Sequence, residues 1–161
     1  DPAELTAYNE REIVRLADAC RRTGHEFLFE IISGNNGKAA APDQILSLMQ
    51  RYYDLGVTPD WWKLEPVEDT GFWTAAGDIV RANDPHLQGI IVLGKEMPEE
   101  HLCRVLAIAR TETLVNGFAI GRTIFSKAAQ AWFAGAIDDN AAQQMMTAVY
   151  SQLIDAWDNA A

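Results

Sequence analysis

Four short apolar segments alternate with helix-type segments, and this alternation constrains the fold more than any other feature of the sequence. The apolar segments are rich in branched and aromatic residues, as buried β-strands are. They span residues 25–32, 58–66, 89–94 and 115–121. Each is followed by apolar residues at helical spacing, and strands that alternate with helices indicate an α/β fold with a parallel sheet.

The helical segments carry recognisable end signals. Asn9 is the predicted N-cap of a first helix over 9–22, and Gly24 is its stop signal. Pro42 opens the second helix, and Asp138 caps a long final helix. The segment 25–32 is almost continuously apolar, which predicts a strand buried on both faces, with a polar, glycine-containing loop at 33–38.

Charged residues recur at corresponding places in the four units. Glu30, Lys63, Lys95 and Arg122 each stand at or just past the end of a predicted strand, roughly 30 residues apart, the length of one βα unit. In (β/α) barrels the strand ends carry the chemistry. A closed barrel needs eight strands and about 250 residues, whereas this chain has four units in 161 residues. We therefore predict a single half-barrel domain over 1–161 that is part of a larger chain.

A half-barrel has two edge strands, which are aggregation hazards if they stay unpaired. A second copy of the chain, the missing barrel half, or the first and last helices could cover them. We expect pairing, either by self-association or with the missing half.

The net charge of −10, from 13 basic and 23 acidic residues, repels nucleic acid and anionic membranes, so we predict neither as a partner. No apolar run approaches the ~20 residues of a membrane span. Cys20 and Cys103 lie far apart, so we expect reduced, buried thiols in a cytoplasmic protein. The histidines show no metal-type spacing, and no glycine-rich nucleotide motif occurs, so neither a metal nor another cofactor is predicted.

The strand segment 58–66 contains one Lys and one Glu. Because a strand sends residues i and i+2 to the same face, Lys63 and Glu65 are expected on one face, and Trp62 and Leu64 on the other. Burying a Lys is costly unless it is paired or used. Lys63 is therefore a structural ion-pair partner of Glu30 or Glu65, an edge lysine whose stem lies on apolar surface, or a reactive amine.

As a reactive amine, Lys63 would form a Schiff base with a carbonyl substrate. Desolvation lowers the pKa of an amine and frees the nucleophile, while nearby carboxylates raise it, and the sequence leaves this balance open. Glu30 and Glu65 would relay protons through carbinolamine formation and carbon–carbon cleavage.

Arg122 follows the last strand and starts a helix, where backbone amides and the guanidinium fork suit a phosphate group. Gly121 precedes it. Lys95 could assist with the phosphate, and both cations could equally be solvated loop residues.

Several segments together resemble a known family: Phe-Leu-Phe-Glu-Ile-Ile (27–32), Trp-Trp-Lys-Leu-Glu-Pro (61–66), Ile-Ile-Val-Leu-Gly (90–94) and Asn-Gly-Phe-Ala-Ile-Gly-Arg-Thr-Ile-Phe (116–125). They are similar to the C-terminal aldolase-like domain fused to bacterial 5-dehydro-2-deoxygluconokinase of inositol catabolism. That domain resembles class I tagatose-bisphosphate aldolases, in which a strand ending in a Lys, Glu and Pro motif carries the Schiff-base lysine. The resemblance covers the second half of the family's TIM-type barrel.

The resemblance implies a Schiff-base role for Lys63, an acidic partner role for Glu30, and phosphate binding at Gly121 and Arg122. The implied reaction is retro-aldol cleavage of 2-deoxy-5-keto-gluconate 6-phosphate to dihydroxyacetone phosphate and malonate semialdehyde. Two alternatives stay open at this point. One is a non-catalytic dimerisation or regulatory domain attached to a sugar kinase; the other is a phosphosugar epimerase or metal-using aldolase on the same scaffold.

Overall fold

The computed structural model of the chain describes residues 2–33 and 41–160. Within them the elements run α1 (Pro2–Thr23), β1 (Leu28–Ile31), α2 (Pro42–Asp54), β2 (Trp61–Leu64), α3 (Thr70–Asn83), β3 (Gly89–Leu93), α4 (Glu99–Ala109), β4 (Val115–Ala119), α5 (Arg122–Phe133) and α6 (Asp139–Asp158). The predicted loop over 33–38 lies, apart from Ser33, outside the described residues.

The four strands form one sheet in the order β1-β2-β3-β4, and every neighbouring pair is parallel. Each strand is joined to the next through a helix, as the alternation in the sequence predicts. The α/β fold class and the four parallel units are therefore confirmed, and the arrangement is that of half a (β/α) barrel.

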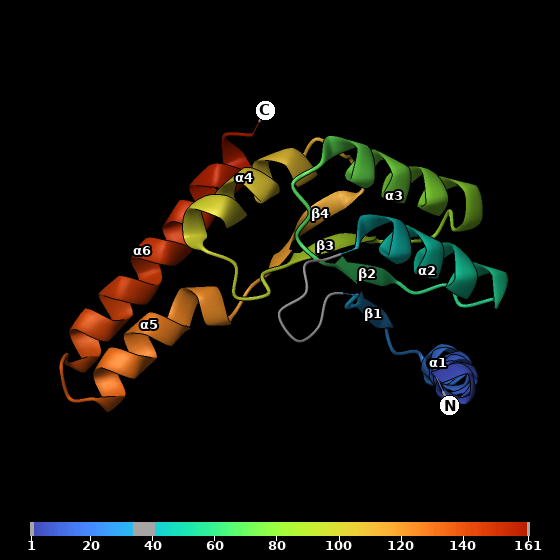
Figure 1. Cartoon of the computed structure of the whole chain (residues 1–161), viewed down its shortest axis with the longest axis horizontal. Helices are drawn as coiled ribbons and strands as arrows, with labels where there is room; N and C mark the ends of the chain where they lie inside the picture. The colour runs from blue at the N-terminus through green and yellow to red at the C-terminus, as the bar shows by residue number, and fades with distance from the viewer. Residues whose placement is uncertain (1, 34–40, 161) are drawn as a thin grey trace.

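Helices α2, α3 and α4 lie on one side of this sheet (Figure 1). On that face, Phe29, Trp62, Ile90 and Val115 form a row of buried side chains across the strands. The neighbouring row, Glu30, Lys63, Ile91 and Gly117, points to the other face and is only half-buried. The alternating burial along β1 and β2 shows that the described helices cover one face of the sheet there and leave the other open.

The prediction that the first strand is buried on both faces is therefore wrong. Leu28 and Ile32 leave 45% and 46% of their surface exposed, while Phe29 and Ile31 between them are buried. The apolar run is continuous because both faces of the strand suit an apolar environment, yet the described chain supplies neighbours for only one of them. All-parallel sheets are normally covered on both faces, so the open face is a candidate for a further partner.

The first helix is longer than predicted and loosely packed. It spans Pro2–Thr23, so Asn9 lies inside the helix rather than at its N-cap. Ile13, Ala17 and Cys20 pack against the core, whereas the neighbouring Leu16 is 49% exposed. Gly24, with a φ of 70°, ends the helix as predicted.

The caps predicted for the later helices are confirmed. The side chain of Asp138 accepts a hydrogen bond from Ala141 N at 2.8 Å at the start of α6. Pro42 is the first residue of α2, and Gly56 follows that helix with a φ of 79°. The thiols of Cys20 and Cys103 are free, and both residues are half-buried against the core rather than fully buried as predicted.

Aromatic residues dominate the core under α2 and α3. The indole of the fully buried Trp62 donates to the hydroxyl of Tyr53 at 2.7 Å, and Trp73 donates to the carbonyl of Val67 at 2.9 Å. Both indole N–H groups are thus satisfied, as burial requires. Burial raises the pKa of Tyr53 to about 12, although the bond from Trp62 opposes this shift. Tyr53 is therefore a neutral structural group at physiological pH.

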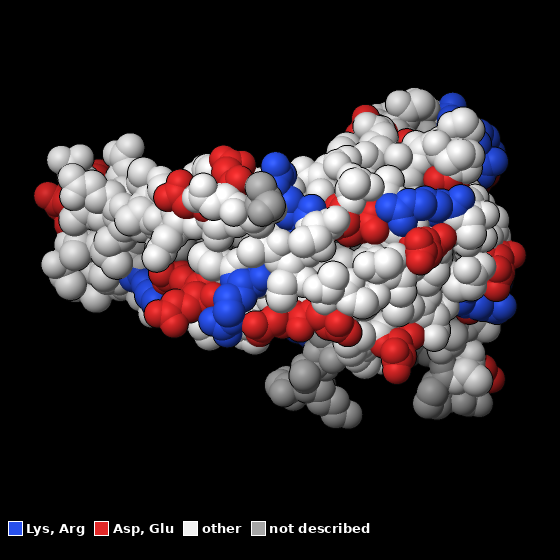
Figure 2. Space-filling view, turned by 90° about the horizontal axis from the view of Figure 1, so that it is seen from above, with Lys and Arg blue, Asp and Glu red and all other residues white. Residues whose placement is uncertain are grey.

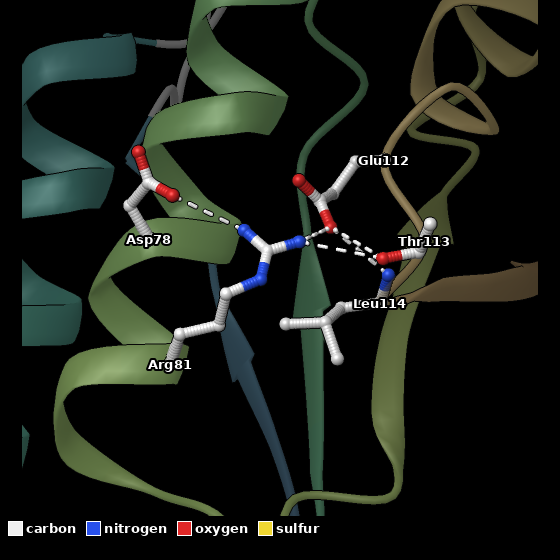
Figure 3. A network of polar contacts seen from close by, with 5 residues as sticks. All are labelled: Asp78, Arg81, Glu112, Thr113 and Leu114. Atoms are coloured by element: carbon white, nitrogen blue, oxygen red, sulfur yellow. Dashed lines mark hydrogen bonds and ion pairs between the residues drawn. The ribbon is translucent and has the colours of Figure 1, made fainter.

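A polar network fastens α3 to the loop that precedes β4 (Figure 3). Arg81 pairs with the buried Glu112 and, at 3.1 Å, with Asp78. Glu112 also accepts from the backbone N–H of Leu114 at 3.1 Å. The network fills the space above Gly77, where a Cβ atom would come within 2.5 Å of the Glu112 carboxyl group.

Acidic and basic side chains are interspersed on the face shown in Figure 2, and the end formed by the α5–α6 connection is largely uncharged. None of the helices in residues 2–33 and 41–160 combines the length and apolar character that crossing a membrane requires.

Candidate active site at the carboxyl ends of the strands

Lys63 and Glu30 face each other across two neighbouring strands. The two residues are register partners in the parallel pair β1–β2, so their side chains leave the sheet on the same, open face. The Lys63 Nζ atom lies 2.9 Å from Glu30 Oε1, and both side chains are partly buried. Of the two partners predicted for Lys63, Glu30 and Glu65, the structure thus pairs it with Glu30, on the face that would form the interior of a barrel.

Glu65 lies directly after the end of β2 and is fully buried. Its Oε2 atom accepts from Ser33 N at 2.8 Å and from Ser33 Oγ at 2.5 Å, and its other oxygen pairs with Lys95. Ser33 Oγ in turn accepts from Ala41 N at 3.0 Å. Glu65 therefore connects the segments that follow β1, β2 and β3. Its predicted role as a proton relay stays a prediction, and its contacts favour a positioning role.

Lys95 and Glu96 form an unusual turn after β3. Their φ values are 50° and 58°, in the left-handed region that non-glycine residues rarely adopt. The Lys95 side chain reaches Glu65, while Glu96 pairs with Arg122 at the start of α5. Such strained turns occur preferentially at functional sites.

Arg122 is the first residue of α5, and Gly121 is the N-cap of this twelve-residue helix. No side chain caps the helix at Gly121. The helix start therefore offers backbone N–H groups, the positive end of the helix dipole and a guanidinium group in one place, a combination that suits an anion.

One pocket of about 410 Å³ brings these groups together. It contains five of the six predicted site residues, namely Glu30, Lys63, Lys95, Gly121 and Arg122. Glu65 lies beneath it as the partner of Lys95. Glu96, Thr123 and Phe125 also line the pocket and were not predicted as site residues. Glu96 was missed because its conformation in the turn, which aims it at Arg122, is not visible in the sequence.

A larger cavity of about 680 Å³ lies at the opposite end of the sheet, between α1 and the amino ends of β1 and β2. Its lining includes His25, Asp60 and His86, but none of the predicted site residues. It follows from the loose packing of α1, and in (β/α) barrels this end serves stability rather than chemistry. In residues 2–33 and 41–160 no three His, Cys, Asp or Glu side chains are grouped so that they could hold a metal ion.

A family model described as an uncharacterized protein conserved in bacteria, DUF2090, matches residues 1–161. The chain belongs to the DUF2090 family. No curated protein matches the sequence. The assignment of chemistry to this DUF2090 chain therefore rests on the geometry of the pocket and on the resemblance of its strand segments.

The DUF2090 pocket combines an amine, a carboxylate within hydrogen-bonding distance of it, and two further cations. Amine and carboxylate together can support imine chemistry on a carbonyl group. The cations around the helix start can bind an anionic group of the same molecule. A compound with both a carbonyl and a phosphate fits this arrangement.

Proposed function

We propose that the chain is an aldehyde-lyase of the class I, Schiff-base type, whose lysine is Lys63. The observation that carries the proposal is the 2.9 Å contact between Lys63 and Glu30 on the open sheet face, in the same pocket as Arg122 and Lys95. The proposed substrate is a phosphorylated keto sugar acid. By resemblance it is 2-deoxy-5-keto-gluconate 6-phosphate, an intermediate of inositol catabolism in the cytoplasm.

In the proposed reaction, Glu30 accepts a proton from Lys63, and the neutral Nζ attacks the ketone carbon. Loss of water from the carbinolamine gives an iminium ion. A base removes the proton of the β-hydroxyl group, and the carbon–carbon bond between the α and β carbons breaks. The β carbon leaves as malonate semialdehyde, while the bonding electrons flow into the iminium to form an enamine.

Protonation of the enamine at its α carbon and hydrolysis of the imine then release dihydroxyacetone phosphate and restore the amine. In this scheme Gly121, Arg122 and Lys95 hold the phosphate, and Glu65 fixes the position of Lys95. The atoms balance without an oxidant, a reductant or a metal ion.

The site also needs a partner in this proposal. The described residues form only one wall of the pocket, because one sheet face is open and the sheet ends in two edge strands. Four more parallel strands would enclose the pocket. We propose that a second copy of the chain, or another half-barrel, supplies them.

Trapping of the imine tests the proposal directly. The protein is incubated with dihydroxyacetone phosphate, reduced with borohydride, and digested for mass spectrometry. We expect an adduct on Lys63 that is absent in Lys63→Met. Lys127→Met is the matched control, because Lys127 lies on α5, pairs with Glu99 at 2.9 Å and does not line the pocket. It should keep the Lys63 adduct, and an adduct confined to other lysines would contradict the proposal.

A second candidate function is a non-catalytic dimerisation or regulatory domain. The same 2.9 Å contact favours it if Lys63 serves only as the cross-strand partner of Glu30. Partly exposed pairs of this kind are worth about 0.2–1 kcal/mol. In that case Lys63→Met would be nearly neutral for stability and self-association, and no adduct would form in the trapping experiment.

A further inference from the structure

Each of the three cations that the described residues place in the candidate pocket faces a carboxylate. Lys63 pairs with Glu30, Lys95 with Glu65 and Arg122 with Glu96. An incoming phosphate therefore does not meet three free cations, and it must compete with a carboxylate that the protein itself provides.

The three pairs differ in how firmly they are held. Glu65 is fully buried and also bound by Ser33, so Lys95 has a fixed partner. Glu30 is anchored within strand β1. By contrast, the side chains of Arg122 and Glu96 are 63% and 55% exposed. The Arg122–Glu96 pair is thus the most easily opened of the three.

The backbone of Glu96 adds to this difference. Both Lys95 and Glu96 adopt positive φ values, and a non-glycine residue in this region carries conformational strain. Because the turn is strained while Glu96 pairs with Arg122, little free energy is lost when the carboxylate moves away. The movement needed is local, because Glu96 follows the end of β3 and precedes α4.

We propose that Glu96 is an internal competitor that occupies the anion position on Arg122 until a phosphate dianion displaces it. This inference rests on the phosphate site of the proposed function. Because Glu96 is tethered to the site, its carboxylate competes at a high effective concentration, and every anion that binds Arg122 meets the same cost of displacing it. A phosphate dianion carries twice the charge and has three oxygens for the guanidinium, Lys95 and the start of α5. The pair therefore weakens the binding of every anion by a similar factor, and a phosphate has enough contacts to overcome it.

The test compares the affinities of inorganic phosphate and acetate for four proteins: wild type, Glu96→Gln, Glu99→Gln and Arg122→Gln. Binding is followed by NMR shifts of backbone amides at constant ionic strength and about pH 8, where phosphate is a dianion. Glu99→Gln is the matched control, since it changes the net charge by the same amount but removes a partner of Lys127 outside the pocket.

We expect Glu96→Gln to bind acetate about two- to fivefold more tightly than wild type, as removal of an exposed competing ion pair allows. The gain for phosphate should be of similar size, because both anions displace the same carboxylate. Glu99→Gln should match the wild type for both anions. Arg122→Gln should lose most of the affinity for phosphate.

The outcomes separate this inference from the proposed function. If Arg122→Gln abolishes phosphate binding but Glu96→Gln binds phosphate and acetate no more tightly than the wild type, Glu96 does not compete for Arg122 and the phosphate site stands. Equal gains in Glu96→Gln and Glu99→Gln would likewise overturn the inference, because they would reflect net charge alone. If neither wild type nor Glu96→Gln binds phosphate, the phosphate site fails and the inference fails with it.

Discussion

At the scale of single residues, Glu65 shows how a buried charge can organise the ends of three neighbouring strands. The carboxylate is fully buried, and it is bound by the backbone N–H and hydroxyl of Ser33 and by the ammonium of Lys95. A buried charge of this kind is tolerated only when its hydrogen-bonding capacity is satisfied. Because its partners follow β1 and β3, Glu65 holds the ends of neighbouring strands in register with β2.

Replacing Glu65 with Leu should destabilise the fold by about 1–3 kcal/mol, since Ser33 and Lys95 lose a buried partner. Urea unfolding followed by tryptophan fluorescence measures the change. Glu68→Leu is the control, because Glu68 is partly exposed, and its pairs with Arg104 and His101 are worth little. Equal stability of the two variants would show that Glu65 does not hold the strand ends together.

The sequence placed Glu30, Lys63, Lys95 and Arg122 at strand ends, because one βα unit separates each from the next, and the pocket unites all four. It did not reveal which carboxylate meets which cation. Alternation along a strand suggested that Glu65 accompanies Lys63, but β2 ends at Leu64 and the rule no longer applies to Glu65. Ion pairs between separate loops depend on backbone angles, such as the positive φ of Glu96, that side-chain patterns do not encode.

At the scale of elements, the packing of α3 against the α4–β4 loop depends on the absence of a side chain at Gly77. Gly77 lies inside helix α3, where Ala would normally be favoured by about 1 kcal/mol. However, its Cβ would lie 2.5 Å from the carboxyl group of Glu112 and 2.8 Å from Arg81. Glu112 is buried and bound by Arg81 and Leu114 N, so it cannot move away without losing its partners (Figure 3).

Gly77→Ala should therefore destabilise the protein, by about 1–3 kcal/mol of overpacking, despite the better helix propensity of alanine. Thermal and urea unfolding provide the measurement. The control is Gly117→Ala in β4, where an added Cβ meets nothing within 4 Å, and it should be neutral or slightly stabilising. If Gly77→Ala is more stable than the wild type, the network around Glu112 rearranges at little cost in free energy, and the overpacking argument is wrong.

Periodicity predicted every described strand and helix, but not how far the first strand and the first helix extend. The segment 25–32 reads as one strand because it is apolar throughout, yet pairing with β2 is limited to Leu28–Ile31. Helix α1 continues upstream of Asn9 because no residue there interrupts it, and an Asn is tolerated inside a helix. Local patterns thus located the elements, while sheet pairing fixed the ends of the strand.

At the scale of the whole molecule, the described residues cover only one face of the sheet. Within the described residues β1 and β4 each have a strand neighbour on one side only, and no helix covers the face that carries Lys63. Leu28 and Ile32 are exposed on the open side of β1. A second copy related by a twofold axis parallel to the strands would place β4 beside the partner's β1 at two equivalent contacts, giving eight parallel strands.

This geometry predicts a dimer of about twice 17.8 kDa in light scattering coupled to gel filtration. Leu28→Lys should weaken the dimer by about 2 kcal/mol, since each of two symmetric contacts loses roughly 1 kcal/mol of apolar burial. Phe133→Lys is the control, because Phe133 is 80% exposed at the α5–α6 end of the molecule, away from the sheet. A monomer at all concentrations, or equal effects of both substitutions, would contradict closure by a second copy. The open face would then need a different half-barrel to complete the pocket around Lys63.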